Sequence, residues 1–187
     1  KPGRRTLTRG RARRKLPFMS EIFKGSFTQQ EPIPDEGIEA ALEVLRSGRL
    51  HRYNLQPGET GEVAALEREF AEYTGARHAL AVTSGGYAMA TALRALGVGP
   101  GDRVLTNAFT LAPVPGATAS VGAQPVFVGV TDNLTIDLDD LAAKADGAEV
   151  LMLSHMRGHI ADMDALTQIC ADTGLTLIED CAHTMGA

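Results

Sequence analysis

A pair of acids and a histidine follow the last apolar run of the chain, where their types and spacing could do chemistry. Residues 175–178 form a short apolar run of the kind that fills a buried parallel strand, and Glu179 and Asp180 follow it directly. Ligands of open α/β sheets bind beyond the carboxyl ends of the strands. We therefore expect Asp180 and His183 at a binding site, although a strand followed by a plain polar loop would give the same residues.

A second candidate lies in residues 83–87 (TSGGY), between a predicted strand and a predicted helix. Two glycines there let the backbone approach a ligand closely, and the N–H groups and dipole of the helix favour an anion. We expect a phosphate to bind there. The alternative is that the glycines only form a tight strand-to-helix turn and bind no ligand. The segment is not GxGxxG and no P-loop lysine follows, which disfavours dinucleotides and nucleoside triphosphates.

A phosphate at the first predicted strand end and a carboxylate at the last suggest one ligand that bridges them. Pyridoxal phosphate fits, because its ring nitrogen stays protonated only beside a carboxylate and the pyridinium acts as an electron sink. Asp180 could supply that charge, and His183 could hydrogen-bond the phenolic oxygen.

His155 and His159 stand four residues apart, a spacing that can bind a metal on a helix. Gly158 interrupts the segment, which has the pattern of a strand end and loop, so we predict structural or substrate-contacting histidines and no metal. Asp162 is expected to cap the next helix.

Charge divides the chain unevenly. Residues 1–18 carry eight basic groups and no acid, which leaves 10 basic against 23 acidic groups, a net of −13, in the rest. The acidic remainder disfavours a nucleic-acid-binding domain. The basic tail is expected to be disordered or foreign to the natural protein, with Met19 as the natural start.

Cysteine usage and hydropathy bear on location. Cys170 and Cys181 give neither a disulfide framework nor a zinc spacing, so we predict a reducing, cytoplasmic location. No apolar run approaches the length of a membrane span, so no membrane partner is expected.

Strand and helix patterns alternate through the chain, which predicts an α/β fold with a mostly parallel sheet and helices on both faces. Strands are expected at 78–83, 103–106, 125–130, 150–154 and 175–178. Helices are expected at 36–47, 62–73, 87–96, 112–121, 138–145 and 162–173. Asp35 is expected to cap the first helix, and Pro113 and Pro115 to confine the fourth to their far side.

Five segments carry a family resemblance: FAEYTGARHALAVTSG, ALRALGVGPGDRVLTNAFT, GAQPVFV, LSHMRGHIADMDAL and GLTLIEDCAHTMGA. In this order they resemble the PLP-dependent sugar aminotransferases of the DegT/DnrJ/EryC1/StrS family, a branch of fold type I, over residues 36–187. The resemblance implies an incomplete fold-type I large domain at 76–187, preceded by a helical segment at 19–75. It also implies transfer of an amino group from an amino acid to a keto group of a sugar or cyclitol, in a homodimer.

The resemblance also implies roles for individual residues. Asp180 matches the aspartate that pairs with the pyridine nitrogen, His183 a residue near the phenolic oxygen, and Leu111 the place of an aromatic side chain that stacks on the ring. The phosphate loop S-G-T-x is matched by Ser84, Gly85, Gly86 and Tyr87. Gly86 replaces the usual Thr and Leu111 the aromatic, which puts a nucleotide-sugar substrate in doubt more than the cofactor.

The family's Schiff-base lysine lies downstream of the aspartate motif, and no lysine here is at a matching position: Lys1, Lys15, Lys24 and Lys144. We therefore expect a further segment or companion chain to bring the lysine and complete the sheet. A PLP-dependent dehydratase or lyase on the same scaffold, and a non-catalytic regulatory protein that keeps the fold, are the alternatives. A Rossmann dehydrogenase is disfavoured, because no ribose-binding fingerprint accompanies the glycines.

Overall fold

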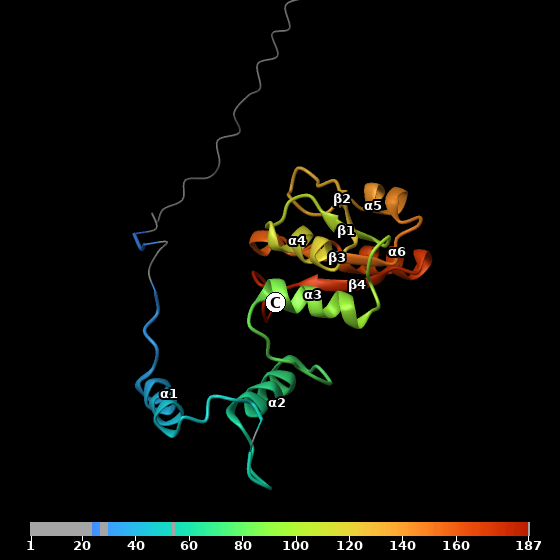
Figure 1. Cartoon of the computed structure of the whole chain (residues 1–187). Coiled ribbons are helices and arrows are strands. Elements are labelled where there is room, and N and C mark those ends of the chain that lie inside the picture. Colours follow the sequence, from blue (N-terminus) through green and yellow to red (C-terminus); the bar gives the residue numbers. More distant parts are fainter. Residues whose placement is uncertain (1–23, 27–29, 54, 187) are drawn as a thin grey trace, which may run out of the picture. The chain divides into compact units, whose positions relative to one another are not determined.

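The computed structural model describes residues 24–26, 30–53 and 55–186 (Figure 1), and the chain divides into two compact units at His51 and Arg52. The basic tail at 1–18 and the expected start at Met19 lie outside the described residues. The predicted domain boundaries stay predictions. Among the described helices, none has the length and apolar character needed to cross a membrane.

The first unit contains helix α1 (Asp35–Ser47). Asp35 is its first residue and not its cap: Pro34 precedes it, and no side chain caps the end. The acidic first turn complements the helix dipole instead. Gly48 ends the helix in a left-handed conformation at φ 67°. No residue of α1 is buried, so its apolar face, with Leu45 61% exposed, is uncovered in this unit.

The second unit begins with α2 (Glu62–Thr74), which Gly75 ends at φ 70°. The prediction of a strand at 78–83 was wrong, because these residues form no strand in the described structure. A strand exists only through a ladder of hydrogen bonds to a neighbour. Here the Ala81 N–H instead donates to Glu67 Oε1 at 2.8 Å, and Leu80 remains 62% exposed.

In the described part of the chain, four parallel strands form the sheet, in the order β2-β1-β3-β4. They are β1 (Arg103–Asn107), β2 (Gln124–Val128), β3 (Val150–Ser154) and β4 (Thr176–Asp180). The predicted α/β class with a parallel sheet is confirmed.

Helices join or precede these strands: α3 (Gly85–Ala95), α4 (Pro113–Ser120), α5 (Leu138–Lys144), α6 (Met163–Thr173) and the short 3-10 turn η1 (Met156–Gly158). Asp137 caps α5 with its carboxylate, and Asp162 caps α6 as predicted. The helix expected at 112–121 is present as α4, but the expectation that Pro113 and Pro115 confine it to their far side was wrong, because α4 begins at Pro113. Both prolines lie in the first turn, where the missing N–H groups have no intrahelical partner to lose.

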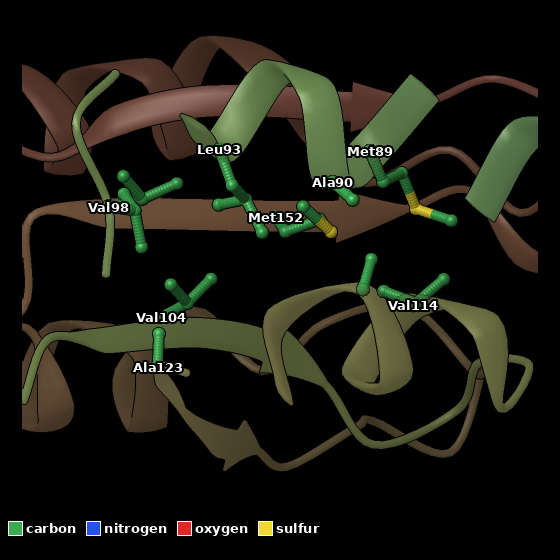
Figure 2. Close-up of a cluster of buried hydrophobic side chains, with 10 residues drawn as sticks. Met89, Ala90, Leu93, Val98, Val104, Val114, Ala123 and Met152 are labelled. Atoms are coloured by element: carbon green, nitrogen blue, oxygen red, sulfur yellow. The ribbon is translucent and has the colours of Figure 1, made fainter. Parts of the chain in front are cut away.

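Two apolar cores lie on opposite faces of the sheet. The first packs α3 and α4 against β1 and β3, with Leu93 and Met152 at its centre (Figure 2). The second packs α5 and α6 against the alternate strand residues, such as Leu105 and Leu151. Helices on both faces are thus confirmed.

The direction of α3 places its N-terminus at the carboxyl edge of the sheet. Figure 2 shows Met89 beside the carboxyl end of β3, and Leu93 further towards its amino end. The first turn of α3 therefore lies at the edge where β1, β3 and β4 end, and α3 also contacts β4.

Candidate functional site

Asp180 ends β4 on the sheet face that α3 covers. In the β3–β4 register Met152 lies opposite Ile178, and Ser154 opposite Asp180. Met152 and Ile178 belong to the α3 core, and side chains two residues apart in a strand share a face. The Asp180 side chain and the first turn of α3, which carries Gly85 and Gly86, thus lie on the same face and edge.

Two donors fix the Asp180 carboxylate. The Ser154 hydroxyl donates to Oδ2 at 3.1 Å, and the Ala182 N–H donates to Oδ1 at 3.2 Å. Asp180 is partly exposed, so its carboxylate is accessible to a ligand and yet held in one orientation.

Asn107 joins the ends of β1 and β3. Its Oδ1 accepts the Ser154 N–H at 2.9 Å, and its Nδ2 donates to the Ser154 carbonyl at 3.0 Å and to the Phe109 carbonyl at 2.9 Å. The β1–β3 ladder runs only to the pair Thr106 and Met152, so this buried amide continues the pairing beyond it. Sequence reasoning missed both Asn107 and Ser154; polar residues that end buried strands were the available signal.

Ser84 caps α3 and accepts the Tyr87 N–H at 3.2 Å on its hydroxyl oxygen. Gly85 and Gly86 follow in helical geometry, and neither has a positive φ. A Cβ at Gly85 would meet nothing within 4 Å, and one at Gly86 would lie 3.7 Å from Pro113 Cβ, an ordinary contact. Neither the backbone conformation nor the packing of the described residues requires these glycines. The open space next to Gly85 is available to a ligand.

Leu111 and Tyr87 have exposed side chains in segments next to this edge of the sheet. Leu111 is 50% exposed after the end of β1, and its carbonyl accepts the Val114 N–H at the start of α4. Tyr87 is 54% exposed in the first turn of α3. Their side chains are accessible, and the stacking role of Leu111 stays a prediction.

His183 lies in the turn after β4, where Arg157 contacts it. The Arg157 N–H donates to His183 Nδ1 at 3.0 Å, which ties the β3–α6 connection to the residues that follow Asp180. His183 is exposed.

His155 lies on the opposite face from Ser154. Its ring is 4% exposed, and its Nε2 lies 2.8 Å from Glu179 Oε2. Together with Cys181 these groups offer potential metal-ligand atoms within 4.8 Å of one another, while His159 is exposed and outside the group. The hydrogen bond between His155 and Glu179 accounts for His155 as a structural residue. The expected absence of a metal stays a prediction.

Lys144 lies in α5, on the face opposite α3. Its ammonium donates to the Phe127 carbonyl at 2.8 Å and to Asp140 Oδ2 at 2.7 Å. This lysine and the Gly129 N–H hold the pKa of Asp140 below its ordinary value. Lys144 therefore serves the β2–α5 contact and cannot serve a ligand held at Asp180. Lys24 belongs to the first unit, and Lys1 and Lys15 lie outside the described residues.

The family model of the DegT/DnrJ/EryC1/StrS aminotransferases matches residues 32–187. The chain belongs to this family. Among curated relatives, a 3-amino-5-hydroxybenzoate synthase from Amycolatopsis mediterranei is 48% identical over 67% of this chain and 33% of its own length. An L-glutamine:2-deoxy-scyllo-inosose aminotransferase from Streptomyces lividus is 36% identical over 83% of this chain and 38% of its own length. A pleiotropic regulatory protein from Geobacillus stearothermophilus is also 36% identical, over 85% of this chain and 41% of its own length.

Solved structures agree with this assignment. A 3-amino-5-hydroxybenzoic acid synthase superposes with a TM-score of 0.73 at 38% identity, over 84% of this chain and 40% of its own. A Streptococcus pneumoniae chain, assigned as a sugar aminotransferase and solved in its PLP form, superposes with a TM-score of 0.71 at 26% identity, over 83% and 42%. The predicted family and the fold-type I architecture are confirmed. The chain spans between 33% and 43% of the length of its curated relatives.

Proposed function

We propose that this chain forms the N-terminal part of the cofactor-binding domain of a PLP-dependent aminotransferase. The observation that carries the proposal is the shared edge of the sheet, where an oriented carboxylate on β4 lies on the same face as a glycine-bearing helix N-terminus. Pyridoxal phosphate has an anion at one end and a basic ring nitrogen at the other, which matches these two groups. Family membership and the PLP form of the pneumococcal relative support the same cofactor.

The residues present fit the cofactor on structural grounds. An alanine would favour the helix more than Gly85 or Gly86 does, and no close contact with the described residues opposes one. Close approach of a phosphate to the backbone explains both glycines. The Ser84 hydroxyl accepts a hydrogen bond from Tyr87, so its own proton is available to donate to a phosphate oxygen.

Each residue then has a definite task. The first turn of α3 binds the phosphate through backbone N–H groups, and Ser84 adds a hydroxyl. Asp180 holds a proton on the ring nitrogen, with its orientation fixed by Ser154 and Ala182. When bound, the cofactor supplies an electron sink for the bonds at the substrate's amino-bearing carbon. Leu111 would contact one ring face through an aliphatic side chain.

The substrates follow from the relatives' names as part of this proposal. Glutamine is the amino donor in the name of the Streptomyces lividus relative, and its acceptor is a keto-cyclitol. We extend both classes, an amino-acid donor and a keto-sugar or keto-cyclitol acceptor, to this protein. A homodimer in the cytoplasm, with a lysine supplied from outside residues 1–187, completes the proposal.

A regulatory protein on the same scaffold is a second candidate, because one relative at 36% identity carries a regulatory name. A dehydratase or lyase on this scaffold is a third. The residue at the Schiff-base lysine position separates them: a lysine that forms an adduct with the cofactor favours the aminotransferase, and its replacement favours one of the others.

The test is Asp180→Asn in the full-length protein, with Glu179→Gln as the matched control. Glu179 precedes Asp180 in the same strand but faces the other side, and glutamine can keep its hydrogen bond with His155. We expect Asp180→Asn to fold and to lose transamination by orders of magnitude, because the ring nitrogen loses the charge that keeps it protonated. The control should keep its turnover. Near-normal turnover in Asp180→Asn would show that the carboxylate is only structural.

A further inference from the structure

The turn between β3 and α6 contains an unusual backbone conformation. Arg157 has φ 58° and ψ 23°, the left-handed region that a large side chain seldom occupies. Leu134 is the other non-glycine residue with positive φ in the described part of the chain. Such a conformation persists only where the surroundings enforce it, and it concentrates at sites with a task.

The surroundings of Arg157 connect it directly to the proposed site. The His155 N–H donates to the Asp180 carbonyl at 3.2 Å, and the Gly158 N–H donates to the His155 carbonyl at 3.2 Å. The turn is thus fastened to the end of β4 on one side. On the other, the Arg157 N–H donates to His183 Nδ1 at 3.0 Å.

This last hydrogen bond decides where the proton of the His183 ring lies. A backbone N–H can only donate, so Nδ1 must be the acceptor. A neutral imidazole has one donor and one acceptor nitrogen, and the proton is therefore on Nε2. A ring with its proton on Nδ1 would set two donors against each other.

We propose that the 156–158 turn is a positioning element, which uses the left-handed Arg157 to hold the proton of the neutral His183 ring on Nε2. His183 then presents a single N–H donor to an oxygen of the bound molecule. That the oxygen is the cofactor's phenolic one rests on the proposed function; the selection of the tautomer does not. Arg157 acts through its main chain, so it is a positioning residue and does not itself contact the ligand.

The tautomer can be measured on the full-length protein without cofactor. Ring ¹⁵N shifts of ¹⁵N-histidine-labelled protein distinguish a protonated from an unprotonated nitrogen, and His183→Gln identifies the His183 signals by their loss. At a pH where the ring is neutral, we expect the ratio of the Nε2–H to the Nδ1–H form to exceed that of free histidine by about tenfold or more, the factor that one hydrogen bond of ordinary strength supplies. A ratio no higher than that of free histidine, or a predominance of the Nδ1–H form, would overturn the proposal.

Two substitutions test whether the turn is the cause. Arg157→Gly keeps the N–H and suits the left-handed region, so the Nε2–H preference should persist. Arg157→Val disfavours that region, so the Nε2–H preference should fall to that of free histidine. Leu134→Val imposes the same conformational conflict elsewhere and should leave the His183 signals unchanged. If Arg157→Val leaves them unchanged as well, the turn does not select the tautomer.

Titration of the same samples with pyridoxal phosphate separates the two proposals. A change of the His183 Nε2 shift on binding supports the donor role. A protein with the Nε2–H tautomer that binds no pyridoxal phosphate would refute the proposed function and uphold the positioning. A protein that binds the cofactor while His183 carries its proton on Nδ1 would support the proposed function and refute the positioning.

Discussion

Gly85→Ala should change folding stability and cofactor affinity in opposite directions. Gly85 is the first residue of α3, without a positive φ, and an added Cβ meets nothing within 4 Å. Alanine is favoured over glycine by up to about 1 kcal/mol within a helix, and the first turn should give about half of that. We expect the cofactor-free protein to be more stable by about 0.5 kcal/mol.

The same methyl group should weaken cofactor binding. It would enter the space that the phosphate needs for its approach to the backbone. Loss of one good hydrogen bond to a charged group corresponds to about 1.5–3 kcal/mol, or a dissociation constant raised by about one to two orders of magnitude. Urea unfolding of the cofactor-free protein measures the first effect, and spectroscopic titration with pyridoxal phosphate measures the second.

Gly116→Ala is the matched control. Gly116 lies within α4, also without a positive φ, and an added Cβ meets nothing within 4 Å. It should stabilise the protein as Gly85→Ala does and leave the cofactor affinity unchanged. An unaltered affinity in Gly85→Ala would place the phosphate elsewhere, and a loss of stability would show that the fold itself requires the glycine.

Two further predictions concern Leu111 and Asp140. Leu111→Tyr should retain stability, because the side chain is 50% exposed, and should shift the absorbance of bound cofactor by placing an aromatic ring on the pyridine; strong destabilisation with an unchanged spectrum would reject the assignment. The folded-state pKa of Asp140 is lowered by Lys144 and Gly129, so its stabilising contribution is present above the ordinary value of 3.8 and is lost as pH falls through the lowered pKa. The stability difference between wild type and Asp140→Asn should therefore shrink below pH 3.8 in acid-unfolding measurements, and a difference that is constant with pH would contradict the linkage.

The sequence predicted the elements whose signals are local. The strand at 150–154 follows from an apolar run, and the cap Asp162 follows from a carboxylate that precedes a helix. The segment 78–83 has the same local pattern, but a strand also needs a neighbour, which no local pattern reports. Pro113 was misjudged because its position within the first turn depends on where the helix begins.

For the candidate site, too, the sequence predicted the features with local signals and missed those that depend on tertiary contacts. The sequence placed Asp180 at the end of a strand and Gly85 and Gly86 at the start of a helix, because residue type and local pattern suffice for that placement, and their role in a site stays a prediction. The contact of Ser154 with Asp180 depends on the β3–β4 register, which pairs residues 26 positions apart. The left-handed Arg157 was equally hidden, since its conformation follows from contacts with the residues around His183 and not from its own side chain.

Transfer of a labelled amino group to the cofactor tests the central claim most directly. The full-length protein would be loaded with pyridoxal phosphate, incubated with α-¹⁵N-labelled glutamine or glutamate, and denatured, and the released cofactor would be analysed by mass spectrometry. An aminotransferase should convert its bound cofactor to pyridoxamine phosphate that carries the ¹⁵N label, and Asp180→Asn should do so far more slowly. If the protein binds pyridoxal phosphate tightly and the cofactor is recovered unconverted with both donors, the account is contradicted.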